Sequence, residues 1–405
     1  MSENVCVYIH VPFCIKKCSY CDFYSTDTLS FLPAYVKSLQ QEIGIRTRLS
    51  SPSAQPFLPP KKARTLYFGG GTPSLLPLEA VKKILETLFT SYRVAKDAEI
   101  TFEVNPGTVD RLYLEGLRNL GINRLSIGVQ SFDAAKIKVL GRIHTIGQSV
   151  DTIEAAKAVG FDNIGCDLIY GTPDETWENW IQDLKRALEF RVSHLSCYML
   201  TLGPGTFLKA RHEQGCFSLP DPETLSDLFM ATSVFLGQNG YEHYEISNFA
   251  RGRKNRSCHN SNYWQMRSYD GFGPSAHSFD AMTDKGQDAG LAFPVRSWNT
   301  ANVSAYIETL VSGRLPVRES EALSLQQQVL ERVMLGLRTS DGIDITAVEK
   351  IWGQDFSRVF APLLSRLETQ GLGVFETGPG KQFHLTLSGR ARLDNIVEAF
   401  ADKIL

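Results

Sequence analysis

The sequence lacks an excess of either charge: Lys and Arg number 42, Asp and Glu number 44, and the formal net charge is −2. Without a basic stripe, binding to nucleic acid is not expected. No apolar run is long enough to span a bilayer, and no charged region followed by an apolar export signal opens the chain. We therefore expect a soluble, cytoplasmic protein, in which the eight cysteines are thiols or metal ligands.

Three cysteines are closely spaced in a CxxxCxxC run formed by Cys14, Cys18 and Cys21. Closely spaced cysteines most often bind a structural zinc ion, but such a site needs four ligands, and no second CxxC or HxxxH supplies the missing pair. His10 or Asp22 could be the fourth ligand, so zinc stays open as the alternative. Three thiolates can instead hold three irons of a four-iron cubane and leave the fourth iron open for a small ligand. The spacing favours this cluster.

Strand-like and helical patterns alternate through the first half of the chain. Strands are expected at 5–10, 65–68, 99–104, 124–129, 163–170 and 194–201. Such alternation implies parallel strands with helical crossovers, and many repeats in a row favour a barrel or part of one. We predict an α/β fold in which residues 1–240 form a partial, TIM-like (β/α)6 barrel. A Pro- and Ser-rich surface insertion is expected at 50–62.

The chain changes character twice after this barrel. A polar, aromatic-rich segment at 241–301 is expected to cover the barrel mouth. Residues 302–405 combine helical patterns with two short strand-like pieces at 372–376 and 382–387, which together resemble a winged-helix unit. Such units often bind DNA, but without a basic recognition helix we expect a smaller, mostly helical packing domain.

Unusual polar residues follow the first four predicted strands. The cysteine loop follows the first strand, the run Gly69–Pro73 (GGGTP) follows the second, Glu103 ends the third and Gln130 ends the fourth. In parallel β/α folds the ligand site lies at these strand ends. Adjacent glycines let a ligand touch bare backbone. A phosphate loop is the rival interpretation, but neither GxxxxGK[ST] nor GxGxxG occurs; a plain tight turn is the other alternative.

Together, the CxxxCxxC loop and the GGGTP turn resemble the radical S-adenosylmethionine (SAM) superfamily. The resemblance implies a partial barrel of six β/α units and a [4Fe-4S] cluster on Cys14, Cys18 and Cys21. It also implies that SAM chelates the open iron through its amino and carboxylate groups. An electron from the reduced cluster would then cleave SAM to a 5′-deoxyadenosyl radical, so an electron donor is implied as a partner. The protein would supply orientation.

Within the superfamily, further runs are similar to the oxygen-independent coproporphyrinogen III oxidase group. These runs are 8–14, 103–106, 128–132, 140–144 and 167–173. Carried over position by position, the resemblance implies a SAM site made of Tyr8, Gly70, Gly71, Thr72, Glu103, Gln130, Arg142 and Asp167. Tyr8 would lie beside the cluster, Glu103 would bind the ammonium of SAM, and Asp167 would accept from ribose hydroxyls. Taken singly, Glu103, Arg142 and Asp167 would be interpreted as surface or ion-paired residues. Because all three occur in the order of the family pattern, a ligand site is favoured.

Two departures separate the chain from the oxidase pattern. The oxidase continues CxxxCxxCxC, whereas this chain has Phe23 in place of the further cysteine. Only 13 residues precede Cys14, so the arm that the oxidase uses around its substrate is expected to be absent. Both features resemble the HemW-type heme chaperone group instead. That resemblance implies binding of heme and its delivery to target proteins.

A third feature, His259-Asn-Ser-Asn-Tyr263-Trp264, is similar to the HNxxYW motif of the HemW-type group. A neutral imidazole is a good axial ligand for heme iron, so His259 is the expected heme ligand. The alternative is a hydrogen-bonded lid that packs on the barrel. Cys258 is adjacent and could also ligate heme, while His277 lies in a run shared with both groups and does not discriminate between them.

Three functional hypotheses follow. The first is a SAM-cleaving heme chaperone that works with heme, heme-accepting target proteins and an electron donor, and whose targets could bring it into peripheral contact with a membrane. The second is an oxygen-independent coproporphyrinogen III oxidase, which forms protoporphyrinogen IX by two oxidative decarboxylations. The third is an electron-transfer or regulatory module, which SAM-dependent formation of 5′-deoxyadenosine would exclude. No residue is assigned a catalytic role.

Overall fold

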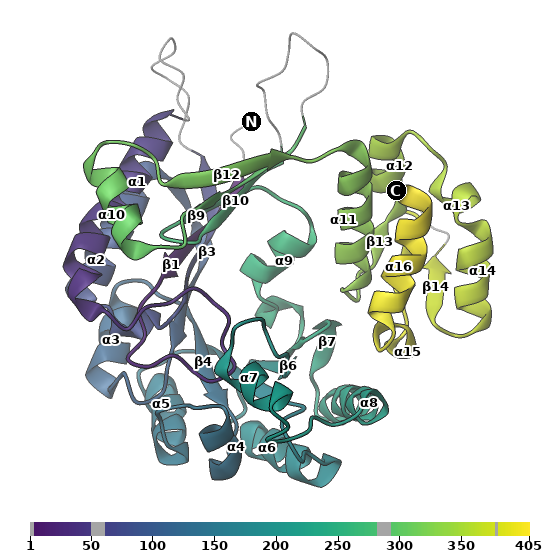
Figure 1. The fold of residues 1–405 in the computed structure, drawn as a ribbon, viewed down its shortest axis with the longest axis horizontal. Helices are drawn as coiled ribbons and strands as arrows, with labels where there is room; N and C mark the ends of the chain where they lie inside the picture. The colour runs from purple at the N-terminus through teal and green to yellow at the C-terminus, as the bar shows by residue number, and fades with distance from the viewer. Residues whose placement is uncertain (1–3, 50–60, 282–292, 377–379) are drawn as a thin grey trace.

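The computed structural model describes residues 4–49, 61–281, 293–376 and 380–405. Its centre is a run of six parallel strands that are neighbours in chain order (Figure 1). They are β1 (Asn4–Val11), β2 (Lys62–Gly70), β3 (Arg93–Val104), β4 (Arg124–Gln130), β5 (Asn163–Tyr170) and β6 (His194–Met199). These strands confirm the six predicted β/α units. Of the predicted insertion, residues 50–60 lie outside the described ranges, and Lys62 already belongs to β2.

Helices cover the outer side of these strands (Figure 1). They are α1 (Leu32–Leu49), α2 (Leu78–Ser91), α3 (Arg111–Asn119), α4 (Ala134–Val139), α5 (Ile146–Ala158) and α6 (Trp177–Glu189). α2 shows why they dock, because its buried residues Val81, Ile84, Leu85 and Leu88 recur at helical spacing. α5 begins with a capping box between Thr145 and Gln148.

The sheet continues past both ends of the parallel run. Six short strands extend it: β7 (Glu242–Glu245), β8 (Asn248–Ala250), β9 (Tyr269–Phe272), β10 (His277–Asp280), β11 (Val295–Asn299) and β12 (Val317–Ala322). The full order is β12-β11-β10-β9-β1-β2-β3-β4-β5-β6-β8-β7, so β12 and β7 are the edges. Segment 241–301 was expected to cover the barrel mouth, and it supplies strands that extend the sheet beyond β1 at one end and beyond β6 at the other. The division of the chain at residues 240 and 301 stays a prediction.

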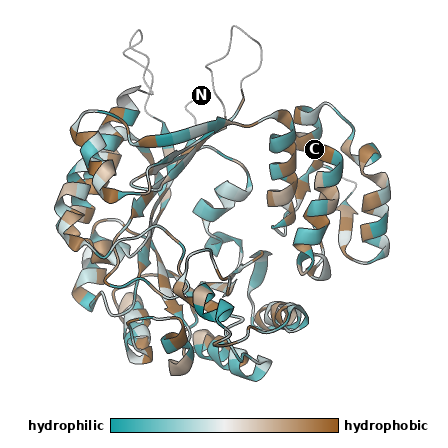
Figure 2. Ribbon diagram, in the orientation of Figure 1, coloured by the Kyte–Doolittle hydropathy of each residue, from teal (hydrophilic) through white to brown (hydrophobic). Residues whose placement is uncertain are grey.

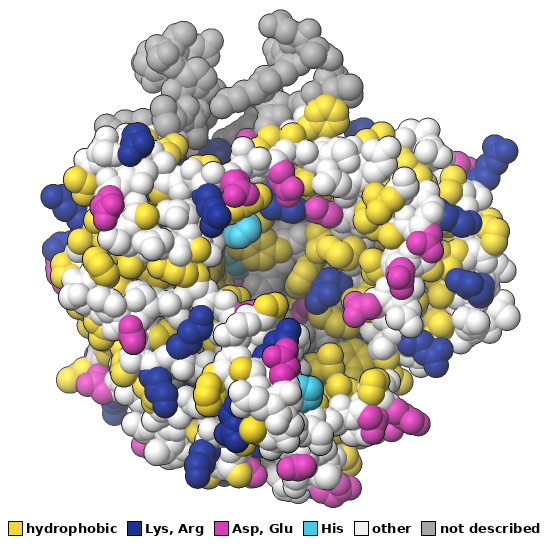
Figure 3. Space-filling model, viewed as in Figure 1, with side chains coloured by type: hydrophobic (Ala, Val, Ile, Leu, Met, Phe, Trp, Pro, Cys, Tyr) yellow, Lys and Arg dark blue, Asp and Glu magenta, His cyan; other side chains and the backbone are white. Residues whose placement is uncertain are grey.

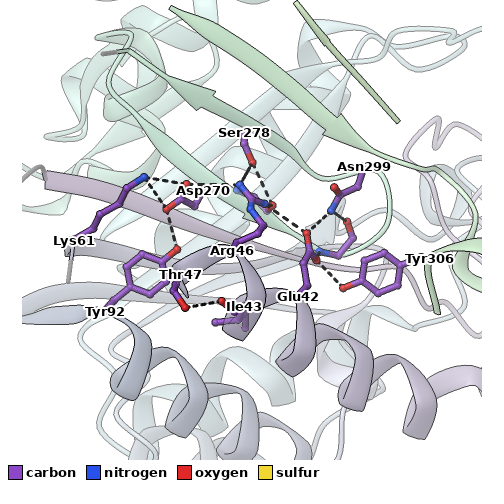
Figure 4. A network of polar contacts seen from close by, with 12 residues as sticks. Glu42, Ile43, Arg46, Thr47, Lys61, Tyr92, Asp270, Ser278, Asn299 and Tyr306 are labelled. Atoms are coloured by element: carbon purple, nitrogen blue, oxygen red, sulfur yellow. Dashed lines mark hydrogen bonds and ion pairs between the residues drawn. The ribbon is translucent and has the colours of Figure 1, made fainter. Parts of the chain in front are cut away.

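A buried polar network joins α1 to β9–β11 and to α10 (Val303–Val311). Figure 4 shows Glu42 at its centre. The carboxylate of Glu42 accepts from the Gly273 N–H at 2.9 Å, the Asn299 amide at 2.7 Å and the Tyr306 hydroxyl at 2.7 Å. Arg46 lies 3.5 Å from the same carboxylate and also donates to the Ser278 hydroxyl at 2.8 Å. The network therefore fixes the position of the added strands against the helix layer.

We expect Glu42→Ala to lower the free energy of unfolding by about 3–5 kcal/mol, because it leaves buried donors without their acceptor. Urea denaturation followed by circular dichroism measures this change. Lys37→Ala is the matched control, since Lys37 is exposed on the same helix, and it should change stability by less than about 0.5 kcal/mol. Equal stability of the two variants would contradict the role given to the network.

The C-terminal residues form a separate helical unit beside the sheet (Figure 1). Its helices are α11 (Leu325–Leu337), α12 (Ile345–Trp352), α13 (Phe356–Val359), α14 (Ala361–Thr369), α15 (Leu387–Arg390) and α16 (Leu393–Ile404). A small sheet of β13 (Ile343–Asp344), β15 (Gln382–Leu385) and β14 (Gly373–Glu376) completes it. Its core, built around Phe356, Phe360 and Phe400, is separate from that of the barrel. Figure 2 shows helices with both apolar and polar stripes, as packing on one face requires.

Among the described residues, no helix combines the length and apolar character needed to cross a membrane.

Candidate functional site

A cavity of ≈ 420 Å³ opens at the C-terminal ends of the parallel strands. Ten predicted site residues line it: Cys14, Cys18, Cys21, Gly70, Gly71, Thr72, Glu103, Gln130, Arg142 and Asp167. The loop after β1 and the strands β2 to β5, with the residues directly after them, supply nine of the ten, and Arg142 comes from the loop after α4. The parallel topology therefore brings most of them together. Tyr8 and His259 are not part of this lining.

The cysteine loop is held against the barrel by backbone and side-chain contacts. The Cys14 N–H donates to the Thr26 carbonyl at 2.9 Å. The Thr72 hydroxyl donates to Cys14 Sγ at 3.4 Å, and Arg142 Nη1 donates to Cys18 Sγ at 3.5 Å. Burial raises the pKa of Cys21, and the neighbouring cysteines raise it further. Donors aimed at two sulfurs would tune the potential of a bound cluster.

The donor set fits a cubane better than a single ion. In the described part of the chain, no three His, Cys, Asp or Glu side chains are gathered closely enough to hold one metal ion. A structural zinc site needs four ligands around a single centre. In a cubane each thiolate binds a different iron, so the three thiols of the loop need only face the same cavity.

At two positions of the GGGTP turn, neighbouring atoms lie so close to the backbone that only glycine fits. Gly70 has φ +114°, and a Cβ there would lie 2.8 Å from the His10 ring. A Cβ on Gly71 would lie 2.7 Å from the Phe13 carbonyl oxygen and 3.1 Å from Cys14 Sγ. The turn is therefore tight, as the plain structural alternative proposed, and it also packs directly on the cysteine loop.

Glu103 is the acidic group next to this turn. Its carboxylate accepts from the Tyr67 hydroxyl at 2.8 Å and from the Gly70 N–H at 3.2 Å. Burial raises the pKa of Glu103 to about 7; the Tyr67 hydrogen bond lowers it, Asp167 raises it, and the Gly70 N–H lowers it. Within the described ranges no Lys, Arg or His forms an ion pair with Glu103, so this buried carboxylate is suited to bind a cation.

Arg142, Gln130 and Asp167 line the same cavity as the cysteines. Arg142 Nη2 donates to Asn105 Oδ1 at 2.8 Å and to the Gly128 carbonyl at 2.9 Å. Gln130 has φ 67°, a left-handed conformation that non-glycine residues adopt mainly at functional sites and turns. Burial raises the pKa of Asp167, although nearby serine hydroxyls lower it.

Sequence reasoning left three residues out of the site. Asn105 accepts from Arg142 and lies 3.3 Å from His144 Nδ1, so it orients both side chains. The Ser126 hydroxyl donates to Asp167 at 3.0 Å, and both Ser126 and Tyr198 line the cavity. Each of the three lies on or directly after a parallel strand, so strand-end position was the available indication.

Tyr8 lies one layer behind the cavity. A Cβ on Gly69 would lie 3.0 Å from the Tyr8 ring, and the Tyr8 hydroxyl is 3.2 Å from His10 Nδ1. Tyr8 therefore supports the glycine turn from behind, and contact with the cluster stays a prediction.

His259 lies on α9 (Cys258–Trp264), against the inner side of β2. Its side chain is 1% exposed, its ring stacks on Tyr67 with centroids 4.8 Å apart, and both ring nitrogens are engaged. Nδ1 is 2.7 Å from the Thr65 hydroxyl and Nε2 is 2.8 Å from the Tyr263 hydroxyl. Burial lowers the pKa of His259 to about 3, and Arg124 lowers it further, so the ring is neutral. This is the packing of a hydrogen-bonded lid; heme ligation by His259 stays a prediction.

Comparison with known proteins places this geometry in a family. The model of the radical SAM superfamily matches residues 8–187, and that of the HemN C-terminal domain matches residues 323–391. The chain is 33% identical to the heme chaperone HemW of Synechocystis over 88% of this chain and 84% of that protein. It is 32% identical to the heme chaperone HemW of Lactococcus lactis over 97% of this chain and 96% of that protein. The chain belongs to the HemW family.

The HemW family fold is shared with an enzyme. The solved structure of coproporphyrinogen III oxidase (HemN) from Escherichia coli, a radical SAM enzyme, matches with a TM-score of 0.79 at 25% identity. The match covers 99% of this chain and 90% of that one. The predicted radical SAM barrel and its C-terminal unit are thereby confirmed. Membership of the superfamily implies a [4Fe-4S] cluster and SAM, and in this HemW family member the cysteine loop and glycine turn lie inside the matched range.

Proposed function

We propose that this protein is a cytoplasmic heme chaperone that binds heme and passes it to heme-accepting proteins. Cys14, Cys18 and Cys21 would hold the [4Fe-4S] cluster, and the remaining cavity-lining residues predicted above would hold SAM. When bound, the cluster supplies an electron to SAM, provided by a separate donor protein. The chain's own residues orient the ligand: Glu103 takes its ammonium, and Asp167 takes its hydroxyls.

The observation that carries the proposal is the apolar rim around the cysteine loop. Ile15 is 52% exposed, Phe23 64% and Met199 47%, and the last two line the cavity. Lys16 and Lys17 line the same cavity and are exposed. Large exposed apolar side chains gathered at one place mark a binding surface. Heme is a broad, flat, apolar and anionic molecule, so apolar side chains beside lysines match its chemistry.

The second candidate is the oxidase reaction, which the shared fold favours. A TM-score of 0.79 to the Escherichia coli enzyme shows that the same framework supports porphyrinogen chemistry. Phe23 argues for the chaperone, because it stands at the cavity where the oxidase pattern has a further cysteine. An exposed phenyl ring there offers a contact for a porphyrin face and no thiol.

Two parallel anaerobic titrations distinguish the heme chaperone from the oxidase. The reconstituted full chain is mixed with hemin, or with coproporphyrinogen III plus SAM and a reductant. We expect saturable heme binding by absorbance, transfer of that heme to an apo-hemoprotein, and no protoporphyrinogen by chromatography. Phe23→Ala should weaken heme binding, whereas Phe89→Ala, at an exposed site on α2, should not. Accumulation of protoporphyrinogen would replace the chaperone proposal with the oxidase.

A further inference from the structure

Most histidines of the chain cannot reach a ligand. The sequence has eight, and five of them are buried: His10, His144, His194, His243 and His259. Four of these five have both ring nitrogens within hydrogen-bond distance of protein atoms. His194 is bonded to Tyr244 and is 1% exposed. Its Nδ1 has no hydrogen-bond partner but is buried, so none of the five offers an accessible free nitrogen to a metal.

The other three histidines are less buried: His212 and His384 are half-buried, and His277 is exposed. His384 lies in the small C-terminal sheet, 3.8 Å from Glu376, and His212 lies in α7 (Phe207–Glu213) with its ring 5.5 Å from that of Phe217. The His277 ring stacks on Trp298, with centroids 5.6 Å apart and planes at 24°. No hydrogen bond to either ring nitrogen of His277 is formed within the described residues, so the stack fixes the ring and leaves its nitrogens open.

The strands that carry His277 and Trp298 are paired with each other and are bonded to α1 through neighbouring residues. The two residues are direct partners in the antiparallel pairing of β10 with β11. Their neighbours Ser278 and Asn299 bond to Arg46 and Glu42 of α1, so these neighbours face the helix layer (Figure 4). Because side chains alternate along a strand, His277 and Trp298 face the opposite side of the sheet.

That opposite side is the one turned toward the C-terminal unit. Arg296, two residues before Trp298, shares its face and donates to Glu331 of α11 at 2.6 Å. Figure 3 shows the molecule hollowed between the sheet and this unit, with histidine and hydrophobic side chains at the edge of the hollow. A ligand that enters the hollow can therefore meet this face of the sheet.

His277 also lies on the side of the cysteine loop. β10 runs antiparallel to β9, and β9 parallel to β1, so the start of β10 lies at the same end of the sheet as the end of β1. The turn that leads into β10 packs on the end of β1, because a Cβ on Gly273 would lie 2.5 Å from the His10 carbonyl oxygen. His10 in turn bonds to the carbonyl of Tyr24, directly after Phe23, at 2.9 Å.

We propose that His277 is an axial ligand to the heme iron and that Trp298 is its positioning residue; this rests on the heme-binding function proposed above. A neutral imidazole nitrogen donates its lone pair to iron, and no electron transfer is needed for the bond. Burial lowers the pKa of His277 from its ordinary value, and Arg296 lowers it further while Glu321 raises it, so the neutral ring is favoured. The motif-based prediction placed this ligand on His259, whose nitrogens are already bonded.

The test is an anaerobic hemin titration of the reconstituted full chain, read by affinity and by the visible spectrum. We expect His277→Ala to weaken heme binding at least about tenfold and to lose the imidazole-ligated spectrum, which added imidazole should restore. His277→Met should shift the spectrum to that of a thioether ligand. Trp298→Ala should give a mixed spectrum, and Trp298→Phe should retain the original one. His212→Ala is the matched control and should behave as the original chain.

Other outcomes separate this inference from the proposed function. If the original chain binds no heme saturably, the proposed function itself fails. If it binds heme but His277→Ala and His277→Met leave affinity and spectrum unchanged, the ligand assignment is overturned while the function stands. If His259→Ala loses the imidazole-ligated heme spectrum while both His277 variants retain it, the assignment of His277 is overturned and His259 of the HNxxYW motif is the ligand.

Discussion

Replacing any one of Cys14, Cys18 or Cys21 by alanine should abolish the brown absorbance of the reconstituted protein. The three thiols line one cavity and belong to one loop, so two of them cannot hold three irons of a cubane. We expect iron and sulfide content per chain to fall to the level of adventitious metal, and SAM-dependent 5′-deoxyadenosine formation to fall below detection. Anaerobic reconstitution followed by absorbance, iron analysis and chromatography measures all three effects.

The matched control for this prediction is Cys216→Ala. Cys216 is exposed, lies in the connection after α7 and is not part of the CxxxCxxC run, so its replacement should leave absorbance and iron content unchanged. If the original chain, after anaerobic reconstitution with iron and sulfide, contains zinc and no iron, the cluster prediction is wrong. Unchanged iron content in a Cys18→Ala chain would contradict the predicted ligand set.

Much of the site was predictable because the parallel strands have strong local patterns. β1 is buried along almost its whole length, and pairing of β1 with β2 sets Val11 opposite Gly70. The cysteine loop and the glycine turn therefore follow neighbouring strand ends, as any parallel β/α arrangement requires. The same rule correctly predicted Glu103 and Gln130, at the ends of β3 and β4, as members of this cavity, whereas Asp167 was assigned by the family resemblance.

The added strands were missed because their evidence is not local. β9 is short and contains Gly271, yet it pairs with residues 6–9 of β1, more than 250 positions earlier in the chain. Its position depends on the buried carboxylate of Glu42, whose partners come from three distant segments. Neither the pairing nor the network leaves a periodic pattern in the sequence.

The two heme-ligand candidates illustrate the same limit. His259 was singled out by its motif and His277 was set aside as common to both related groups. The structure reverses their accessibility, because Thr65 and Tyr263 enclose the ring of His259 while His277 stacks on Trp298 at an exposed position. A motif reports residue types, whereas enclosure depends on which distant side chains supply hydrogen-bond partners.

Glu103→Gln should weaken SAM binding by about 10- to 100-fold, which corresponds to a charge-assisted hydrogen bond of about 1.5–3 kcal/mol. The substitution keeps the size of the side chain and one oxygen that can accept from either Tyr67 or Gly70, so the fold and the cysteine cluster should persist. Isothermal titration of the anaerobic, cluster-loaded chain with SAM measures the loss. Glu154→Gln, at an exposed position on α5, should bind SAM as the original chain does.

The pH dependence of SAM affinity gives the same residue a second, independent test. The carboxylate form is the one that attracts an ammonium, and burial raises the pKa of Glu103 to about 7. Below that pH the group is mostly protonated, so SAM affinity of the original chain should rise about tenfold from pH 6 to pH 8. Glutamine has no proton to lose in this range, so Glu103→Gln should remove that rise. A rise of equal size in both chains would assign the titration to another group and leave the ammonium without its predicted partner.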